Sequence, residues 1–329
     1  MRKVLLTTTA LVALGGVSAA SAIDISGSYM FDYTDSDNST VNTGGTNNSS
    51  MGSDARIVFS GETTSDAGVT FGGSYALSAA GAVEDQGLYM SGDFGYIMAG
   101  ATDGVVDGMD NFMNMSSYVE YGAGTAQSGN SNVALNTGAG MSDTATAEKV
   151  GYRSPEISGF QLGVSFTDAG RQSGADNTQW MVTYDFGLAK VGYGATDIDA
   201  ATNNGATTGQ TQAGFGTTIN DINIRYGYMT DKVKGANGAG VSSDIKTSDI
   251  GIVYSGIENI TLYYEGVSSK EKVGTNVNDK MDSNAFGLSY AIAPGVSALV
   301  ENTSADYIDA DGTNTDSSNT MRLGLSVTF

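Results

Sequence analysis

Acidic side chains gather in one long segment of the sequence that contains no base. Between positions 101 and 147 the carboxylates are Asp103, Asp107, Asp110, Glu120 and Asp143, and no lysine or arginine accompanies them. Carboxylates concentrated in this way create a negative potential, which attracts cations. The first half of the segment is also rich in large apolar residues, which favours packing against other parts of the protein. The alternative interpretation is that these acids are solvated loop charges.

A second acidic run, close to the end of the sequence, has spacing similar to that of a calcium loop. Asp309, Asp311 and Asp316 place oxygen ligands at intervals around Gly312. The run lacks the bidentate glutamate that completes an EF-hand. An acidic surface turn is therefore the favoured interpretation, and a calcium site is the less favoured alternative.

The composition argues against several kinds of chemistry. The sequence has no cysteine, so neither a disulfide nor a thiolate metal site can form, and no histidine, the commonest general base and metal ligand. We therefore predict that the protein is not an enzyme and has no cofactor. Its 15 basic and 36 acidic residues give a net charge of −21, so we expect no binding of nucleic acid.

The first 22 residues have the pattern of a secretory signal peptide. Arg2 and Lys3 precede an apolar stretch over 4–17, and small residues at Ala20 and Ala22 suit a signal peptidase. We predict cleavage between Ala22 and Ile23, which leaves residues 23–329 as the mature protein. An uncleaved membrane anchor is the alternative, but the apolar stretch is short for a membrane helix.

Apolar residues recur at every second position through most of the remaining sequence. One example is Trp180, Val182, Tyr184 and Phe186. This period of two is typical of a β-strand with one apolar and one polar face. Segments of this kind predict sixteen strands, of which 96–100 and 160–167 are the weakest. Short connections are expected at 64–67, 92–95, 155–158, 187, 220–221, 256–258 and 291–294, and long ones at 34–53, 79–84, 101–147, 168–178, 197–209, 231–245, 269–281 and 305–318.

Charged residues within the predicted strands fall on the parity opposite to the apolar residues. Examples are Asp32, Arg225, Glu301 and Arg322. A Lys or Arg that faces mid-bilayer lipid costs about 2–4 kcal/mol, whereas one that faces a wet lumen costs little. The pattern, together with the alternation of short and long connections, predicts an all-β protein: a sixteen-stranded antiparallel transmembrane β-barrel. A soluble β-sandwich is the alternative.

Three motifs are similar to those of the trimeric general porins of Gram-negative bacteria, in particular the alphaproteobacterial branch. They are Gly87-Leu88-Tyr89-Met90-Ser91-Gly92-Asp93-Phe94-Gly95-Tyr96-Ile97-Met98-Ala99-Gly100, the hairpin Val150–Pro155 followed by Ser158-Gly159-Phe160, and the alternating C-terminus that ends in Phe329. The resemblance implies a homotrimer in outer-membrane lipid and a final strand that the barrel-assembly machinery reads through Phe329. The sequence departs from the family at Ala101, where a basic residue is common, and in its short second external loop.

The resemblance also places the long third loop, about 101–147, inside the barrel lumen. Asp103, Asp107, Asp110 and Glu120 are then candidates for an acidic constriction. Strand parity offers basic partners on the pore wall, namely Arg56, Lys149 and Arg153. We therefore expect a porin of the Gram-negative outer membrane, a passive diffusion channel for small hydrophilic solutes and ions with a moderate preference for cations. The alternatives are a substrate-specific channel and a non-conducting structural or adhesive barrel.

Overall fold

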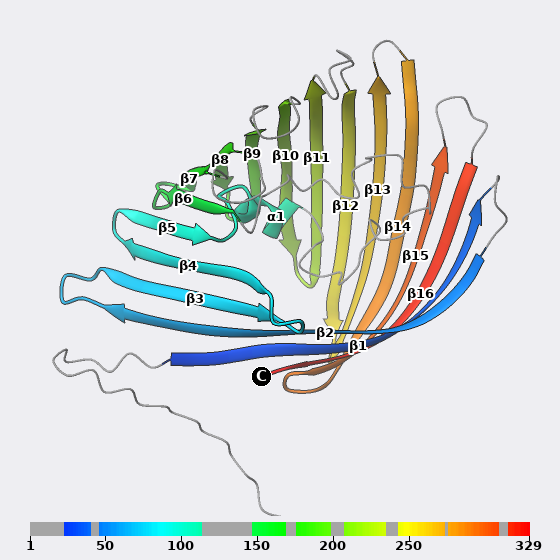
Figure 1. Cartoon of the computed structure of the whole chain (residues 1–329), viewed down its shortest axis with the longest axis horizontal. Coiled ribbons are helices and arrows are strands. Elements are labelled where there is room, and N and C mark those ends of the chain that lie inside the picture. The colour runs from blue at the N-terminus through cyan, green and yellow to red at the C-terminus, as the bar shows by residue number, and fades with distance from the viewer. Residues whose placement is uncertain are drawn as a thin grey trace, which may run out of the picture.

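The computed structural model describes residues 23–40, 46–113, 147–168, 176–198, 207–234, 243–273, 276–308 and 315–329. These residues form sixteen strands and one short helix (Figure 1). The first eight strands are β1 (Ile23–Thr40), β2 (Thr46–Thr64), β3 (Thr70–Ser78), β4 (Val83–Gly92), β5 (Gly95–Ala101), β6 (Glu148–Arg153), β7 (Phe160–Thr167) and β8 (Asn177–Asp185), with helix α1 (Asp107–Met113) between β5 and β6. The other eight are β9 (Ala189–Ile198), β10 (Thr207–Ile219), β11 (Ile222–Lys234), β12 (Ser243–Ile257), β13 (Ile260–Val273), β14 (Asn276–Ala293), β15 (Val296–Ile308) and β16 (Thr315–Thr328).

The strands close into one antiparallel barrel, which confirms the predicted fold. Each strand pairs with its neighbours along the chain, and β1 completes the circle by pairing with β16. At this seam Tyr29 lies opposite Val327, and Phe31 lies opposite Leu325. Because every strand has a partner on both sides, the barrel has no edge with unpaired backbone groups, which a strand in lipid could not tolerate. Figure 1 shows the long strands β12 to β16 standing side by side in the wall.

The two faces of the wall differ in polarity. In β8, Trp180 is 44% exposed, whereas Gln179 and Thr183 on the alternate positions are buried. The exposed outer face carries large apolar side chains around the barrel, and the inner face carries polar and charged ones such as Asp32, Glu265 and Glu301. Apolar side chains outside and polar side chains inside are the arrangement expected of a barrel in lipid. The parity predicted for the charged residues is therefore confirmed.

Within the described residues, no helix is both long and apolar enough to cross a membrane.

The short connections predicted from the sequence are present and lie at one end of the barrel. The turn between β10 and β11 contains Asn220 at φ 54°, and the turn between β12 and β13 contains Asn259 at φ 61°. Asparagine adopts this left-handed conformation more readily than most residues other than glycine. Between β14 and β15, Pro294 precedes Gly295 at φ 73°. Tight turns of this kind fix the register of each hairpin.

At the other end, several strands extend further than the sequence analysis predicted. The connection expected at 34–53 is largely strand, because β1 and β2 stay paired as far as Asn38 opposite Thr46. The connection expected at 269–281 is also mostly strand, since β13 and β14 pair up to Val273 opposite Asn276. The prediction relied on alternating apolar residues, and that signal is absent from the extended part of β1 and β2, where polar residues such as Asp35 and Ser49 pair. The backbone ladder continues beyond it because hydrogen bonding between strands does not require apolar side chains.

One apolar cluster lies within the barrel rather than on its surface. Val105, Val106, Met109 and Met113 come from α1 and the turn before it, and they are almost completely buried. They pack with Met98 of β5, Met181 of β8 and Met229 of β11, which are also buried. Figure 1 shows α1 beside β9 to β11, the strands that it contacts. The cluster fixes the start of the long segment after β5 against the wall.

Candidate pore constriction

Helix α1 lies closely against glycines on the inner face of the wall. A methyl group on Gly192 of β9 would lie 3.0 Å from Cζ of Phe112 and 3.1 Å from Sδ of Met113. A methyl group on Gly216 of β10 would collide with the carbonyl oxygen of Phe112. Both glycines share a strand face with buried polar residues such as Thr196 and Gln212, so α1 sits on the face opposite to the exposed aromatics. The missing side chains therefore allow the helix to approach the wall.

Buried hydrogen bonds hold the turn that precedes α1. The backbone amide of Val105 donates to Oγ of Ser165 on β7 at 3.2 Å. The Ser165 hydroxyl donates in turn to Oε1 of Gln179 on β8 at 3.0 Å. Ser165 and Gln179 are fully buried, so this chain of hydrogen bonds has little competition from water. The apolar cluster and this polar chain together fix the position of residues 105–113.

Two bases on β6 also hold the start of the segment. Lys149, which is 3% exposed, donates from Nζ to the carbonyl oxygen of Thr102. Arg153 donates from Nη2 to the carbonyl oxygen of Gly104 at 3.5 Å. A methyl group on Gly108 would lie 3.1 Å from Cζ of Arg153, so the guanidinium also packs against the first turn of α1. A buried charge is costly unless hydrogen bonds satisfy it, and these backbone carbonyls provide such bonds.

The structure describes only some of the predicted constriction acids. Asp103 is exposed in the connection after β5, and Asp107 is half-buried at the first residue of α1. Each makes contacts with other groups. Asp110 lies in α1, but its side chain is outside the described part, and Glu120 lies wholly outside the described residues. Lys149 and Arg153 thus share one neighbourhood with the stretch that contains Asp103 and Asp107.

The third predicted base, Arg56 on β2, pairs with a different pair of acids. Its Nε lies 3.0 Å from Oε2 of Glu84, and its Nη2 contacts Oδ2 of Asp85. Both acids lie at the start of β4. One arginine therefore faces two carboxylates, and the group as a whole carries a negative charge. All three side chains are partly exposed.

A second arginine also faces two carboxylates, in a charge cluster that the sequence analysis did not single out. Arg322 of β16 lies 3.2 Å from Oδ2 of Asp32 on β1 and 3.7 Å from Oε1 of Glu301 on β15. The hydroxyl of Tyr263 on β13 donates to the other oxygen of Glu301 at 2.6 Å. Strand parity had already placed Asp32, Glu301 and Arg322 on the inner face. Their contact depends on how the last strand meets the first, which a local pattern does not reveal.

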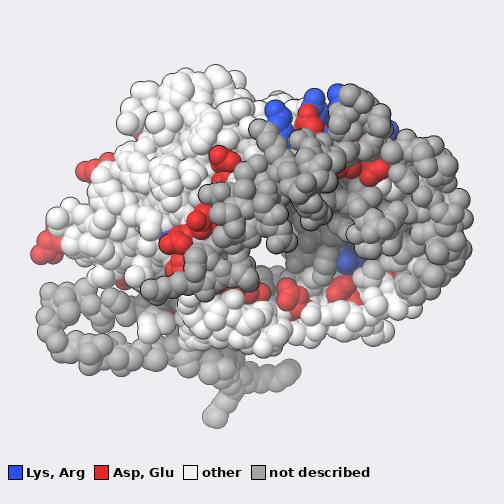
Figure 2. Space-filling model, turned by 45° about the horizontal axis from the view of Figure 1, so that its top comes forward, with Lys and Arg blue, Asp and Glu red and all other residues white. Residues whose placement is uncertain are grey.

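A remaining base completes the surroundings of α1. The ammonium group of Lys190 on β9 lies 5.1 Å from the centre of the Phe112 ring. Cations are attracted to aromatic faces at this distance. Figure 2 shows acidic groups along the edge of the opening at the centre of that view. The barrel thus combines a polar inner wall with a segment fixed against it.

This geometry is that of a membrane channel, and comparison with known proteins supports it. The sequence matches the family of Gram-negative porins over residues 7–319. The chain belongs to the Gram-negative porin family. No curated protein sequence matches the chain. The family and the fold confirm the predicted outer-membrane channel, whereas assignment to the alphaproteobacterial branch stays a prediction.

Solved structures share the fold of this porin at low sequence identity. An anion-selective porin from Comamonas acidovorans aligns with a TM-score of 0.70 at 12% identity, covering 94% of this chain and 100% of that chain. OmpF of Salmonella typhi, in a complex with daunomycin, aligns with a TM-score of 0.66 at 15% identity, covering 94% and 98%. The trimer form of in-vitro folded OmpT of Vibrio cholerae has a TM-score of 0.63 at 13% identity, covering 94% and 100%.

The porin closes its seam with the residue predicted as an assembly signal. Phe329 donates its backbone amide to the carbonyl oxygen of Gly27 at 3.0 Å, and the amide of Gly27 donates to the carbonyl oxygen of Phe329 at 2.9 Å. The Phe329 ring covers Gly27, where a methyl group would lie 2.9 Å from the ring atom Cζ. The side chain is 68% exposed at the short-turn end of the barrel. Ile23 begins β1 at the same end, while Ala22 lies outside the described residues.

The predicted calcium loop falls mainly outside the described residues. Asp309 and Asp311 are not described, and Asp316 is described only as a backbone position in β16, where it pairs with Tyr307 and Thr40. Among the described residues there is no cluster of three or more acids that would hold a metal ion. The calcium alternative in 309–316 therefore remains an expectation from spacing alone.

Proposed function

We propose that this porin is a water-filled diffusion channel for small hydrophilic solutes and ions with a moderate preference for cations. At each of two places on the wall, one arginine faces two carboxylates, and this observation carries the proposal. Arg56 faces Glu84 and Asp85, and Arg322 faces Asp32 and Glu301. Each group has one more negative than positive charge. A cation that passes these groups is therefore stabilised, and an anion is repelled.

The segment 101–147 is proposed as the constriction. Its anchoring by the methionine cluster, by Ser165 and by the two bases of β6 supports a position within the lumen. Asp103, Asp107, Asp110 and Glu120 would then line the narrowest part of the aqueous path. Charges in a narrow space act across a lower effective dielectric than charges on an external loop. These acids should therefore influence ion selectivity more than any others in the chain.

The basic residues have two distinct parts in this proposal. Arg56 stands on the pore wall and reduces the negative potential of its neighbours. Lys149 and Arg153 are bound to the backbone carbonyls of Thr102 and Gly104, so they position the start of the constriction segment. Their charge still contributes to the local potential. For this reason the proposed preference is moderate and anions are not strictly excluded.

Assembly and processing form a second part of the proposal. The trimer form of the structurally similar OmpT of Vibrio cholerae supports a homotrimer. The exposed Phe329 at the end of the closing strand supports recognition by the barrel-assembly machinery. Residues 1–22 act as a signal peptide cleaved between Ala22 and Ile23. Passive transport requires neither catalysis nor a cofactor, and we propose no binding of nucleic acid.

Ion transport through a planar lipid bilayer tests the proposal directly. Purified mature porin is inserted into a bilayer between two potassium chloride solutions of different concentration, and the zero-current potential is measured. We expect stable water-filled conductance and a potential of the sign that cation preference produces. An anion-selective potential would contradict the charge argument. Block by a low concentration of one solute would favour a substrate-specific channel, and a lack of conductance would favour a structural barrel.

A further inference from the structure

The methionine cluster consists of five buried thioether side chains around α1. Within the described residues they are Met98 of β5, Met109 and Met113 of α1, Met181 of β8 and Met229 of β11. Each is at most 5% exposed, and the two other buried members of the same apolar cluster are valines. Leucine and isoleucine fill apolar space as well as methionine does, and they specify a core more sharply because they are less flexible. Packing alone therefore does not account for a thioether at five positions.

The two methionines of α1 direct their sulfur atoms to one position on the wall. Met109 and Met113 are four residues apart, so their side chains lie on one face of the helix. That face stands over Gly192 of β9. A methyl group on this glycine would lie 3.4 Å from Sδ of Met109 and 3.1 Å from Sδ of Met113. Two thioether sulfurs therefore converge above a place that the glycine leaves open.

Two further methionines come from the wall beside this position. Met181 lies opposite Gly194 of β9, which is two residues from Gly192 along the same strand. Met229 lies opposite Gln212 of β10, and Gln212 lies opposite Gly194. The two methionines therefore belong to one row of inner-face residues across β8 to β11. At about 3.3 Å per residue, this row crosses β9 about 7 Å from Gly192.

The chemistry of this cluster suits a soft metal ion. Thioether sulfur is a soft ligand, and soft ligands select ions such as copper(I) and silver(I). The sequence has no cysteine, so methionine supplies all of its sulfur. The ammonium group of Lys190 lies 5.1 Å from the centre of the Phe112 ring, which places a positive charge near the cluster. Because repulsion grows with the charge of the incoming ion, this lysine favours a monovalent over a divalent ion.

We propose that the methionine cluster binds one soft monovalent metal ion, copper(I) or silver(I), between α1 and the wall. Met109 and Met113 supply sulfur from the helix, and Met181 and Met229 supply sulfur from the wall. The thioethers are neutral and lose no proton when they coordinate the ion. The ion enters from the water-filled lumen of the proposed function, whereas its coordination depends only on side chains around α1.

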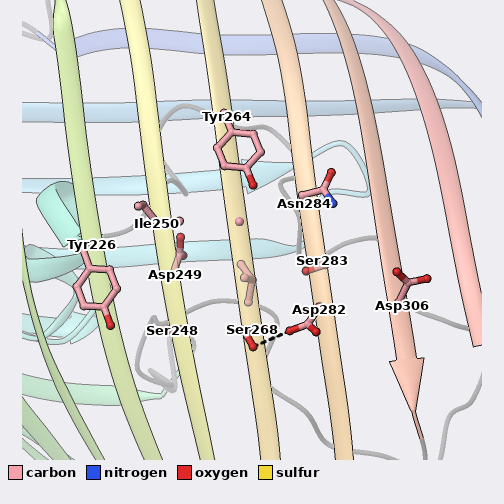
Figure 3. Close-up of a pocket in the computed structure, with 12 residues that line it drawn as sticks. Tyr226, Ser248, Asp249, Ile250, Tyr264, Ser268, Asp282, Ser283, Asn284 and Asp306 are labelled. Carbon is pink, nitrogen blue, oxygen red and sulfur yellow. Dashed lines mark hydrogen bonds between the residues drawn. The ribbon is translucent and has the colours of Figure 1, made fainter.

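A hollow of the outer wall offers a contrasting set of ligands. Figure 3 shows Asp282, Asn284 and Asp306 around it, and Ser268 donates to Oδ1 of Asp282 at 2.6 Å. Oxygen ligands of this kind suit hard ions such as magnesium and calcium. A metal ion that bound to the porin through carboxylates would therefore be displaced by excess magnesium. An ion held by the sulfur atoms of the methionine cluster would stay bound.

Titration calorimetry with silver nitrate tests the proposal on mature porin in neutral detergent and chloride-free buffer. We expect one tight site for each barrel. The variant Met109→Leu, Met113→Leu retains most of the apolar volume and removes two sulfurs, so it should bind silver about tenfold more weakly. The matched control is Met51→Leu, Met321→Leu, because these methionines are 73% and 46% exposed and lie outside the cluster. It should bind silver as the wild type does.

Two further measurements identify the ligands in the wild-type porin without any substitution. The X-ray absorption spectrum of the silver-loaded porin should show sulfur atoms around the ion. Excess magnesium nitrate should leave the silver bound. Because both measurements and the titration use porin in detergent, they do not depend on conduction or on ion preference.

Several results would overturn the proposal. They are a lack of tight silver binding by the wild type, equal binding by the wild type and the α1 variant, and displacement of silver by magnesium. Weaker binding by the exposed-methionine control than by the wild type would also overturn it, because the ion would then lie at the surface. Heat-dependent gel migration verifies that each variant is a folded barrel.

Discussion

Arg322 of β16 donates from Nε to Oδ2 of Asp32 on β1 at 3.2 Å, across the seam that closes the barrel. The first and last strands of the barrel therefore share a charged contact as well as a backbone ladder. Glu301 of β15 extends the contact to a third strand. Asp32 and Glu301 are buried on the inner face and the Arg322 side chain is only 11% exposed, so lost partners are not readily replaced by water. The cluster thus links closure of the barrel to the charge of its lumen.

Removal of Arg322 should destabilise the barrel. Arg322→Gln leaves Asp32 and Glu301 as neighbouring buried carboxylates, and breaking a buried ion pair in this way costs about 3 kcal/mol. Thermal unfolding followed by circular dichroism should show a lower transition temperature. Arg56→Gln is the matched control, because Arg56 also faces two acids but its side chain is 44% exposed. An exposed pair contributes about 0–1 kcal/mol, so equal destabilisation by the two variants would contradict this account.

A methyl group at Gly216 should displace α1 without opening the barrel. In Gly216→Ala the new carbon would collide with the carbonyl oxygen of Phe112, so the helix must move away from β10. Single-channel conductance should then change, since the proposed constriction segment, 101–147, contains this helix. Gly209→Ala on the same strand is the control, because a methyl group there meets no atom within 4 Å. Unchanged conductance in the Gly216 variant would argue against a constriction anchored by α1.

Much of the fold was predictable because strand parity depends only on local sequence. Gln179 is polar and the adjacent Trp180 is largely apolar, and the structure places them on opposite faces. Short turns were predictable for the same reason, as at Pro294 and Asn220. The strand ends at the long connections were not predictable, because polar residues such as Asp35 and Ser49 pair there without an apolar signal.

The site was predictable in outline only. Sequence analysis placed Lys149 and Arg153 on the inner face but did not predict their bonds to the carbonyl oxygens of Thr102 and Gly104. Such contacts depend on how a connection folds back on the wall, and no periodic pattern reports that. The contact between Arg322 and Asp32 was not predictable for a similar reason, since the two residues are separated by nearly the whole chain. The roles of Asp110 and Glu120 in the constriction remain predictions.

The mature porin should migrate as a trimer on a detergent gel when the sample is not heated. Boiling should convert it to the monomer, because heat disrupts contacts between subunits and then the barrel itself. The measurement is a comparison of unheated and boiled samples, with light scattering as an independent estimate of mass. Migration as a monomer in both samples, together with a monomeric mass, would contradict the trimer and leave the barrel unaffected.

Deletion of Phe329 should reduce the amount of porin assembled in the outer membrane. The deletion removes two backbone hydrogen bonds with Gly27 and an aromatic ring at the rim. Rim aromatics stabilise the position of a barrel at the membrane boundary. Folded protein in outer-membrane fractions is measured by heat-dependent gel migration. Phe329→Tyr keeps the ring and the backbone contacts, so it should assemble normally. Normal assembly of the deletion variant would disprove the role of Phe329.

The acids of the segment 101–147 should set the preference for cations. Replacing Asp103, Asp107 and Asp110 together by Asn removes three negative charges and changes side-chain size little. The zero-current potential in a salt gradient should therefore move toward anions while the barrel stays folded. The control replaces Asp306, Asp309 and Asp311 by Asn, in the segment 305–318 that the sequence predicts to be a long external connection. Charges on such a connection would be screened by salt over about 8–10 Å, so they should change selectivity much less. Equal shifts in the two variants would show that the segment is not the constriction, because position along the pore would then have no influence on selectivity.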